Sequence, residues 1–242
     1  IYTKQYINME ETIKICAFSD FHGDLPNIEP CDLVIIAGDI IPFNIQHKNN
    51  DSNEWIKTVF TDWCNSIDCK YIVAIPGNHD RWAEGITMTK MNKLLSGISN
   101  IHMLRNEFLE LDVLDSGYDL KIFGTPYCAR YGNWPFMRED KVLKKKFAEI
   151  PDGLDILITH DPPNGLSDCD YSKYDCQHLG SLALTDRIED LDKLGEKPRL
   201  IICGHIHEGS REFENGIINV AMLNRHCNAI INNPTYMNFT YG

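Results

Sequence analysis

Several features that mark other protein classes are missing from this chain of 242 residues. No apolar run reaches the roughly 18 residues that a membrane helix needs. Residues 1–14 contain no apolar stretch long enough for a signal peptide. No Gly/Ser/Pro-rich linker, internal repeat or flavin- or nicotinamide-binding fingerprint occurs. These absences argue against a helical membrane protein and a dinucleotide-dependent oxidoreductase.

Positive charge is scarce as well. Lys and Arg number 23 against 35 Asp and Glu, which gives a net charge of −12. An acidic chain offers no broad surface for long nucleic acid or an anionic membrane, so we expect neither as a partner. A small anionic substrate remains compatible with this charge, because bound divalent cations can dominate the local field.

The nine cysteines are irregularly spaced and include no Cys-x-x-Cys pair, so no zinc ribbon is indicated. We expect reduced thiols and a cytoplasmic protein, because disulfides are rare in that compartment. A disulfide between Cys169 and Cys176 is the alternative that the spacing leaves open.

The apolar pattern predicts the order of the elements. Short continuous apolar runs indicate strands buried on both faces, and helical spacing indicates amphipathic helices. Strands are predicted at 13–19, 32–37, 71–75, 101–104, 107–111, 120–123, 155–159, 200–203, 212–213 and 217–221, and helices at 53–66, 87–95, 138–150 and 179–194. The strand–loop–helix order predicts parallel βαβ units and an α/β fold.

The same pattern predicts one domain over residues 13–230. Residues 1–12 are interpreted as an N-terminal extension, of which residues 1–8 are processed sequence or a cloning remnant. Residues 231–242 are rich in Asn and are predicted to be an irregular C-terminal tail.

Polar side chains follow five of the predicted buried strands. Because ligands of open α/β sheets bind at the carboxyl ends of the strands, we expect these side chains to share one edge. They comprise Asp20, His22, Asp39, Asn78, His79, His160, His205 and His207. Apart from His79, they are seven potential ligands of carboxylate, imidazole and amide type, which suit Mn, Fe, Zn, Ni or Mg. Seven ligands are too many for one tetrahedral zinc and fit two ions that share a bridging carboxylate.

The motifs Asp20-Phe-His22, Gly38-Asp39 and Gly77-Asn78-His79-Asp80, followed by His160 and by Gly204-His205-Ile-His207, resemble in this order the signature of the calcineurin-like metallophosphoesterases. Four further blocks resemble the MPPED (239AB-like) branch: Gly124-Thr-Pro126, Trp134-Pro-Phe136, residues 159–165 and residues 204–209. The superfamily resemblance covers Asp20 to His207 and implies two packed mixed β-sheets flanked by helices, a four-layer sandwich.

The resemblance also implies roles for individual residues. One metal would be bound by Asp20, His22 and His207, the other by Asn78, His160 and His205, and Asp39 would bridge them. His79 would act as the catalytic proton donor or stabilise the transition state, with Asp80 orienting it. Arg81 and Asn78 would contact the substrate phosphate.

The function expected from this resemblance is hydrolysis of a phosphate ester by a hydroxide that bridges two divalent metals (Mn, Fe, Zn or Ni). A small phosphorylated substrate is expected, above all a phosphodiester such as a cyclic nucleotide. Two alternatives stay open. One is a phosphomonoesterase, and the other is a non-catalytic metal-binding scaffold of the same fold, which the intact ligand set disfavours.

Overall fold

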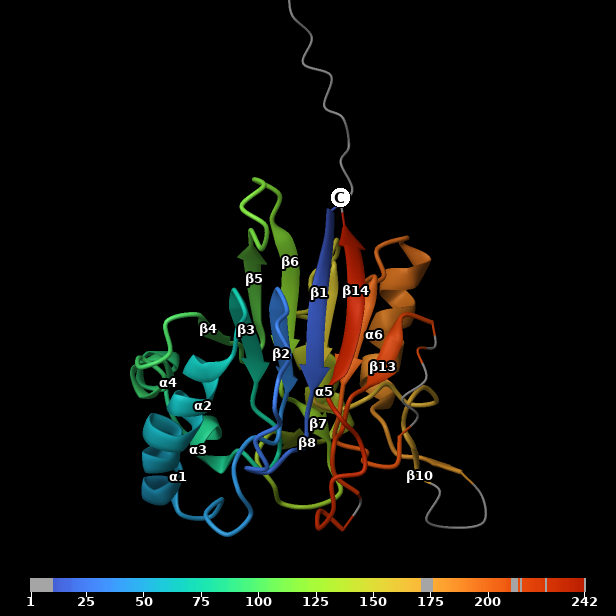
Figure 1. Ribbon diagram of the computed structural model, residues 1–242. Helices are drawn as coiled ribbons and strands as arrows, with labels where there is room; N and C mark the ends of the chain where they lie inside the picture. The colour runs from blue at the N-terminus through green and yellow to red at the C-terminus, as the bar shows by residue number, and fades with distance from the viewer. Residues whose placement is uncertain (1–10, 171–175, 210–212, 214, 225, 242) are drawn as a thin grey trace, which may run out of the picture.

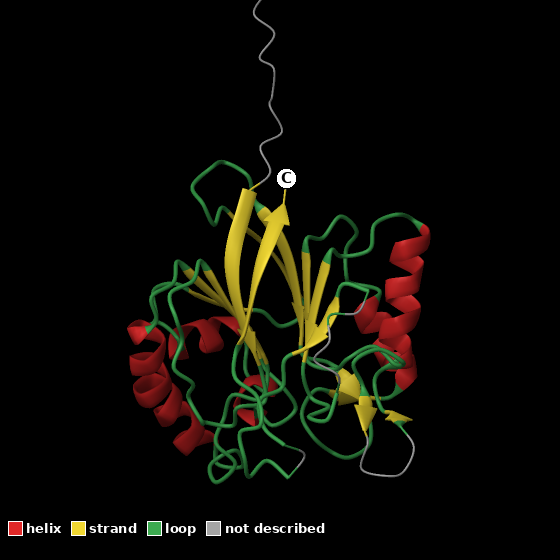
Figure 2. Cartoon of the chain, turned by 45° about the vertical axis from the view of Figure 1, so that its right-hand side comes forward, coloured by secondary structure: helices red, strands yellow, loops and turns green. Residues whose placement is uncertain are grey.

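Two β-sheets pack face to face, and helices cover their outer faces (Figure 1, Figure 2). The computed structural model describes residues 11–170, 176–209, 213, 215–224 and 226–241. The predicted α/β fold with two mixed sheets flanked by helices is confirmed. Among these described residues, no helix has the length and apolar character needed to cross a bilayer.

The first sheet has the strand order β14-β1-β2-β3-β4. Strands β1 (Glu11–Phe18), β2 (Leu33–Ala37), β3 (Tyr71–Ile75) and β4 (Ile101–Met103) are parallel. Strand β14 (Thr235–Tyr241) pairs antiparallel with β1 from Glu11↔Tyr241 to Ala17↔Thr235. Parallel pairing brings the carboxyl ends of four strands to one edge, the lower one in Figure 1.

The second sheet has the order β13-β12-β9-β6-β5. Strands β6 (Leu120–Thr125), β9 (Ile156–Thr159), β12 (Leu200–Cys203) and β13 (Ile217–Asn219) are parallel, and β5 (Glu107–Leu111) is antiparallel to β6. Two small ribbons lie outside the sheets: β7 (Cys128–Ala129) with β8 (Met137–Arg138), and β10 (Cys169–Asp170) with β11 (Gln177–His178).

The helices form the two outer layers. The first sheet is covered by α1 (Asn49–Trp55), the π-helical turn η1 (Ile56–Phe60), α2 (Thr61–Ser66), α3 (Arg81–Glu84) and α4 (Met88–Leu94). The second sheet is covered by α5 (Asp140–Phe147) and α6 (Leu182–Lys193). Each sheet is therefore buried on both faces, which explains why its strands are continuously apolar.

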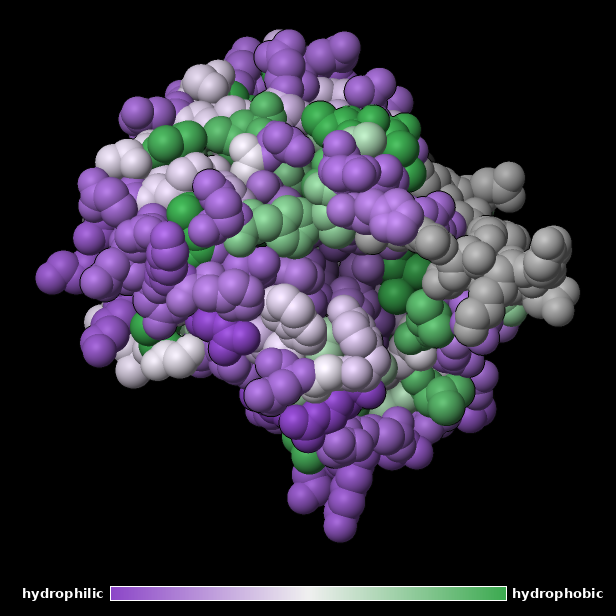
Figure 3. Space-filling model, turned by 90° about the horizontal axis from the view of Figure 1, so that it is seen from below, coloured by the Kyte–Doolittle hydropathy of each residue, from purple (hydrophilic) through white to green (hydrophobic). Residues whose placement is uncertain are grey.

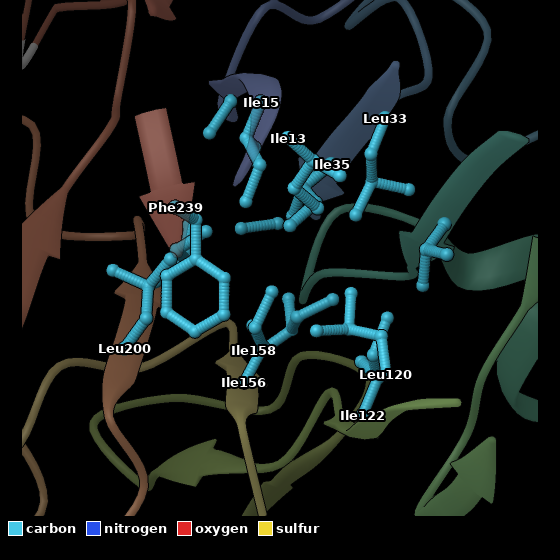
Figure 4. Close-up of a cluster of buried hydrophobic side chains, with 14 of the residues drawn as sticks. Ile13, Ile15, Leu33, Ile35, Leu120, Ile122, Ile156, Ile158, Leu200 and Phe239 are labelled. Carbon is cyan, nitrogen blue, oxygen red and sulfur yellow. The ribbon is translucent and has the colours of Figure 1, made fainter. Parts of the chain in front are cut away.

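Alternation along the strands divides the core into layers. Ile13 and Ile15 of β1 face the other sheet, whereas Cys16 and Phe18 face the helices. Figure 4 shows the layer between the sheets, where β1 and β2 side chains meet those of β6, β9 and β12. Burying each large aliphatic side chain contributes about 1.5–3 kcal/mol, so this layer fixes how the two sheets face each other.

Several expectations need correction. The prediction of an irregular tail from residue 231 is wrong, because β14 completes the first sheet and buries Phe239 and Tyr241. The N-terminal extension ends before residue 11, because β1 begins at Glu11. Helix 53–66 begins earlier, at Asn49, and contains a π-helical turn.

Cys169 and Cys176 are joined by a disulfide, which the 5.3 Å between their Cα atoms permits, so the expectation of reduced thiols is wrong for this pair. The predicted strand 212–213 is not formed at Phe213, which has no regular secondary structure. Residues 1–10 and Glu212 lie outside the described part.

Candidate metal centre

The seven predicted ligands gather at the carboxyl ends of the parallel strands. Asp20 and His22 follow β1, Asp39 follows β2, Asn78 follows β3, His160 follows β9, and His205 and His207 follow β12. Five of them supply ligand atoms to two groups: Asp20 with His22 and Asp39, and Asp39 with His160 and His205. Asp39 belongs to both groups. His207 groups with His22 and Cys227, and Asn78 Oδ1 lies 2.9 Å from His160 Nε2. Figure 3 views the molecule from this end and shows a hollow with hydrophilic residues in it.

The backbone at this edge adopts a conformation that side-chain-bearing residues rarely take. Asp20, His22, Asp39 and His205 have φ angles of 54°, 43°, 55° and 65°. The left-handed region costs an L-residue about 1–2 kcal/mol. Strain of this kind persists where the surrounding structure enforces it, and it marks functional sites. In this protein, the left-handed backbone conformation directs these four potential ligands away from the strand direction and toward one another.

Two glycines permit the close approach of these loops. A Cβ on Gly77 would collide with the carboxylate of Asp39 and the ring of His160. A Cβ on Gly204 would collide with Ser19 and the carboxylate of Asp20. The glycines beside the ligands therefore leave room for the ligands themselves.

Asp20 anchors the first group and links the two sheets. Its Oδ1 lies 3.1 Å from His207 Nε2, and its Oδ2 accepts hydrogen bonds from Ser19 Oγ (2.5 Å) and the His205 backbone N–H (2.9 Å). His207 Nδ1 donates to the Asn224 carbonyl at 2.7 Å. A histidine fixed through one nitrogen presents the other to a metal, as is usual for metal-binding imidazoles.

His22 gives the clearest indication that this group binds an ion. Its side chain is 1% exposed, and neither ring nitrogen has a hydrogen-bond partner among the described residues. Its Nε2 lies 3.7 Å from Asp39 Oδ2. Two atoms bound to one ion lie roughly 3–4 Å apart, since each bond is about 2.0–2.2 Å long. A buried imidazole without a partner is costly, and a cation between it and Asp39 would remove that cost.

The second group is equally compact. His160 Nδ1 donates to the Ala37 carbonyl at 2.9 Å, and its Nε2 lies 2.9 Å from Asn78 Oδ1 and 3.5 Å from Asp39 Oδ2. The rings of His160 and His205 are 4.9 Å apart. His160 and Asn78 are fully buried. These donors are also of types that bind divalent ions, and Asp39 belongs to this group as well as to the first.

Charges in the two groups offset one another. Burial raises the pKa of Asp39, but His160 and His79 outweigh it and hold that pKa well below its ordinary value. Burial opposes protonation of His160 and His207, yet Asp39 and Asp20 raise their pKa values to about 10 and about 11. Burial lowers the pKa of His22 to about 4 and that of His205 to about 3. Cations would replace the protons of His160 and His207.

A cleft of about 220 Å³ opens above the ligands. Three of the seven ligands, Asp39, His205 and His207, line this cleft. We call the seven ligand side chains together the floor, and four other residues that line the cleft the rim: Tyr131, Leu179, Glu208 and Cys227. Tyr131 stacks on His205 with a ring distance of 5.7 Å and is 69% exposed. His79 also lines the cleft. A substrate would therefore meet His79 and the floor together.

A family model described as calcineurin-like phosphoesterase matches residues 5–209. The chain belongs to this family. The match includes all seven floor residues, so the resemblance drawn from the motifs is confirmed. The family supports a metal-dependent phosphoesterase, and the two groups of ligand atoms agree with it.

Relatives of this chain differ in length. Metallophosphoesterase domain-containing protein 1 of Homo sapiens is 28% identical over 194 residues, 74% of this chain and 55% of that protein, and its similarity supports the predicted branch. A probable rhamnogalacturonate lyase C of Emericella nidulans is 28% identical over 83% of this chain but only 18% of its own length. The chain thus spans about half or less of these two relatives.

The fold of the chain also has a solved counterpart. Phosphopantetheinyl hydrolase from Mycobacterium tuberculosis superposes with a TM-score of 0.51 and 12% sequence identity. The superposition covers 88% of this chain and 90% of that one. At this identity the likeness shows the fold alone.

His79 is held by a residue that the sequence did not indicate. Its Nδ1 bonds to Gln46 Oε1 at 2.6 Å, and its backbone N–H donates to Asp39 Oδ1 at 2.7 Å. Phe43 and Trp134 pack around the ring at 5.2 Å and 4.5 Å. Burial lowers the pKa of His79, although Asp39 opposes this.

Asp80 does not orient His79, which corrects the role expected for it. Its carboxylate accepts backbone N–H bonds from Gly77 (2.7 Å), Ile40 (3.1 Å) and Ile41 (3.0 Å). Burial, followed by the nearby charge of Asp39, raises its pKa to about 7. Asp80 instead ties the loop after β3 to the loop after β2, and thereby places Asn78 beside Asp39.

Arg81 begins helix α3 and is not among the cleft-lining residues in the described part of the chain. Its contact with a substrate phosphate stays a prediction, as does that of Asn78. The sequence also missed Cys227, whose Sγ lies 3.7 Å from His207 Nδ1 and whose side chain lines the cleft. No motif distinguishes either residue: Gln46 lies in the connection between β2 and α1, seven residues after Asp39, and Cys227 lies in the loop between β13 and β14.

Proposed function

We propose that this chain hydrolyses small phosphodiesters, such as cyclic nucleotides, with two divalent ions bridged by Asp39. One observation carries the proposal: Asp39 Oδ2 lies 3.7 Å from His22 Nε2 on one side and 3.5 Å from His160 Nε2 on the other. A carboxylate shared in this way by two groups of ligand atoms suits a two-ion site. Mn, Fe, Zn and Ni all match the donor types.

The floor residues would bind the ions in fixed positions. Asp20, His22 and His207 would bind one ion, and Asn78, His160 and His205 the other. When bound, such ions neutralise charge on phosphoryl oxygens and lower the pKa of water from 15.7 to about 7. The buried carbonyl and amide partners of Asp20, His160 and His207 hold the floor rigid, so little reorganisation is needed during the reaction.

His79 would deliver a proton to the leaving oxygen. Gln46 holds Nδ1 and leaves Nε2 available to the substrate. A lowered pKa makes the protonated ring a stronger acid, which favours this transfer. Phe43 and Trp134 restrict the ring to one orientation.

The charge of the cleft favours a diester over a monoester. Its described lining contains the carboxylates of Asp39 and Glu208 and neither Lys nor Arg. A phosphodiester carries one negative charge, whereas a monoester carries close to two at neutral pH. At the same metal charge, a monoester would therefore meet more repulsion from Asp39 and Glu208 than a diester would.

The test compares two p-nitrophenyl substrates. Metal-stripped chain is assayed with bis-p-nitrophenyl phosphate and with p-nitrophenyl phosphate, before and after Mn²⁺ addition, beside an Asp39→Asn variant. We expect Mn²⁺ to restore diester hydrolysis in the wild type and not in the variant. A clear preference for the monoester would overturn the diester proposal. Absence of both activities with every divalent metal, together with retained metal binding, would favour the non-catalytic scaffold.

A further inference from the structure

A second cluster of ligand-type side chains lies on the β10–β11 ribbon, apart from the floor. Cys169, Cys176 and His178 each offer one atom, and the three atoms lie within 4.8 Å of one another. Cys176 Sγ is 3.8 Å from His178 Nε2. A sulfur and an imidazole nitrogen bound to one zinc ion lie about 3.6 Å apart, given bonds of about 2.3 Å and 2.0–2.1 Å in tetrahedral geometry.

Asp168 supports His178 through a hydrogen bond to the imidazole ring. His178 Nδ1 donates to Asp168 Oδ1 at 2.7 Å, and the Asp168 side chain is fully buried. Asp168 Oδ2 accepts the backbone N–H groups of Gly165 (3.1 Å) and Gly180 (2.9 Å). A carboxylate behind a histidine fixes its tautomer and leaves Nε2 as the metal-binding atom, which is the usual support for a zinc-bound imidazole.

The histidine is also accessible. Its side chain is 50% exposed and borders a second pocket, of about 370 Å³. A metal here would have three protein ligands and a fourth position open to solvent. Two thiolates and an imidazole favour a thiophilic ion such as zinc, whereas the seven floor ligands include no thiolate.

We propose that the β10–β11 ribbon carries a zinc site formed by Cys169, Cys176 and His178, which is available only when the Cys169–Cys176 disulfide is reduced. A dithiol reductant donates two electrons, the S–S bond breaks, each sulfur takes up a proton, and the reductant becomes a disulfide. Zinc then displaces the two thiol protons as two Zn–S bonds and one Zn–N bond form. Reoxidation reverses the sequence and releases the ion.

The site adjoins the catalytic cleft. Leu179 follows His178 directly and lines the rim, and its backbone N–H donates to the Asp168 carbonyl at 3.3 Å. The inference does not rest on the proposed function, since the ribbon shares no ligand with the floor.

The experiment uses Co²⁺ as a spectroscopic probe for zinc in the full chain. Thiolate-to-cobalt charge transfer absorbs in the near ultraviolet, whereas carboxylate and imidazole ligands of the floor give no such band. We expect the band in dithiol-reduced wild type and not in oxidised wild type. Zinc counted by atomic spectroscopy should rise by one ion per chain upon reduction, and added Zn²⁺ should abolish the cobalt band.

Single and double substitutions can show which residues produce the thiolate-to-cobalt absorption band. Cys169→Ser with Cys176→Ser should remove it, and His178→Ala should weaken it. Asp168→Asn should lower cobalt affinity by about 10- to 100-fold, the effect expected for a residue that supports a ligand. Cys227→Ser, which alters the thiol beside His207, should leave the band intact. Loss of the band in Cys227→Ser, persistence in the double serine variant, or an equal band in oxidised wild type would overturn the proposal.

Discussion

The floor and the rim of the cleft are built in opposite ways. Floor residues such as Asp20, Asn78 and His160 are fully buried and lie within three residues of the ends of parallel strands. Backbone groups hold Asp20 and His160 in place. On the rim, Tyr131 is 69% exposed and Leu179 45% exposed, and both come from loops. The difference indicates that the floor sets the chemistry, whereas the rim can vary without disturbing it. Variants of both regions can test this division.

Asp39→Asn should have the largest effect. The amide keeps the shape of the side chain but removes the charge that two ions would share, and the Asp39 carboxylate also accepts the His79 N–H. Loss of a residue that merely supports a ligand costs about 10–100-fold in metal affinity, so loss of the bridge should cost more than about 100-fold. Metal content by atomic spectroscopy and turnover should fall together.

Asp24→Asn is the matched control, because Asp24 is an exposed acid close to His22 in the same loop. It should leave metal content and turnover unchanged. Full metal occupancy with normal turnover in Asp39→Asn would contradict the bridging role and remove the main distinction between floor and rim.

His79→Ala should come next. We expect turnover to fall by about 10²- to 10⁴-fold, the range for loss of a general acid. Both metals should stay bound, because His79 is not in the ligand set. His102→Ala, which alters a histidine of β4, should change neither quantity. Metal loss in His79→Ala would show instead that His79 belongs to the floor.

The floor could be predicted from sequence, and the rim could not. Each floor residue follows an apolar strand and lies beside a glycine or within a short motif. The local sequence pattern is therefore enough to predict where each of these residues lies in the fold. Gln46, Tyr131 and Cys227 have no such context, and only the packing of long loops brings them to the cleft. Asp80 misled the prediction because proximity in sequence suggested contact with His79, whereas its carboxylate turns to the backbone.

The same reasoning explains the fold. Parallel strands buried on both faces give unmistakable apolar runs, and all five strands that carry floor residues were predicted within two residues of their observed ends. Strand β14 was missed because the Asn-rich segment before it suggested an irregular tail. Its residues Tyr236, Met237 and Phe239 are β-favouring or apolar. The strand pairs with β1, which lies more than 200 residues away in the sequence, and a local sequence pattern does not reveal such a long-range pairing.

Gln46→Ala should have a moderate effect, because Gln46 lies behind His79 rather than in the floor. Loss of one hydrogen bond costs about 0.5–1.5 kcal/mol, which corresponds to roughly 2- to 10-fold in turnover. Metal content should not change. In the double variant with His79→Ala, the Gln46 substitution should have no further effect on turnover. Additive losses would mean that Gln46 acts independently of His79.

Alkylation of Cys227 should have the smallest effect that is still measurable. Cys227 lines the cleft, so a carbamidomethyl group would occupy part of its 220 Å³ and hinder the substrate. We expect iodoacetamide to raise KM for bis-p-nitrophenyl phosphate more than it lowers kcat. Cys227→Ser should change activity little and should abolish the sensitivity of the enzyme assay to iodoacetamide. Loss of that sensitivity would show that alkylation of the other thiols does not cause the effect. A large fall in kcat and metal content for Cys227→Ser would move this residue from rim to floor, since its Sγ lies close enough to His22 and His207 to share an ion with them.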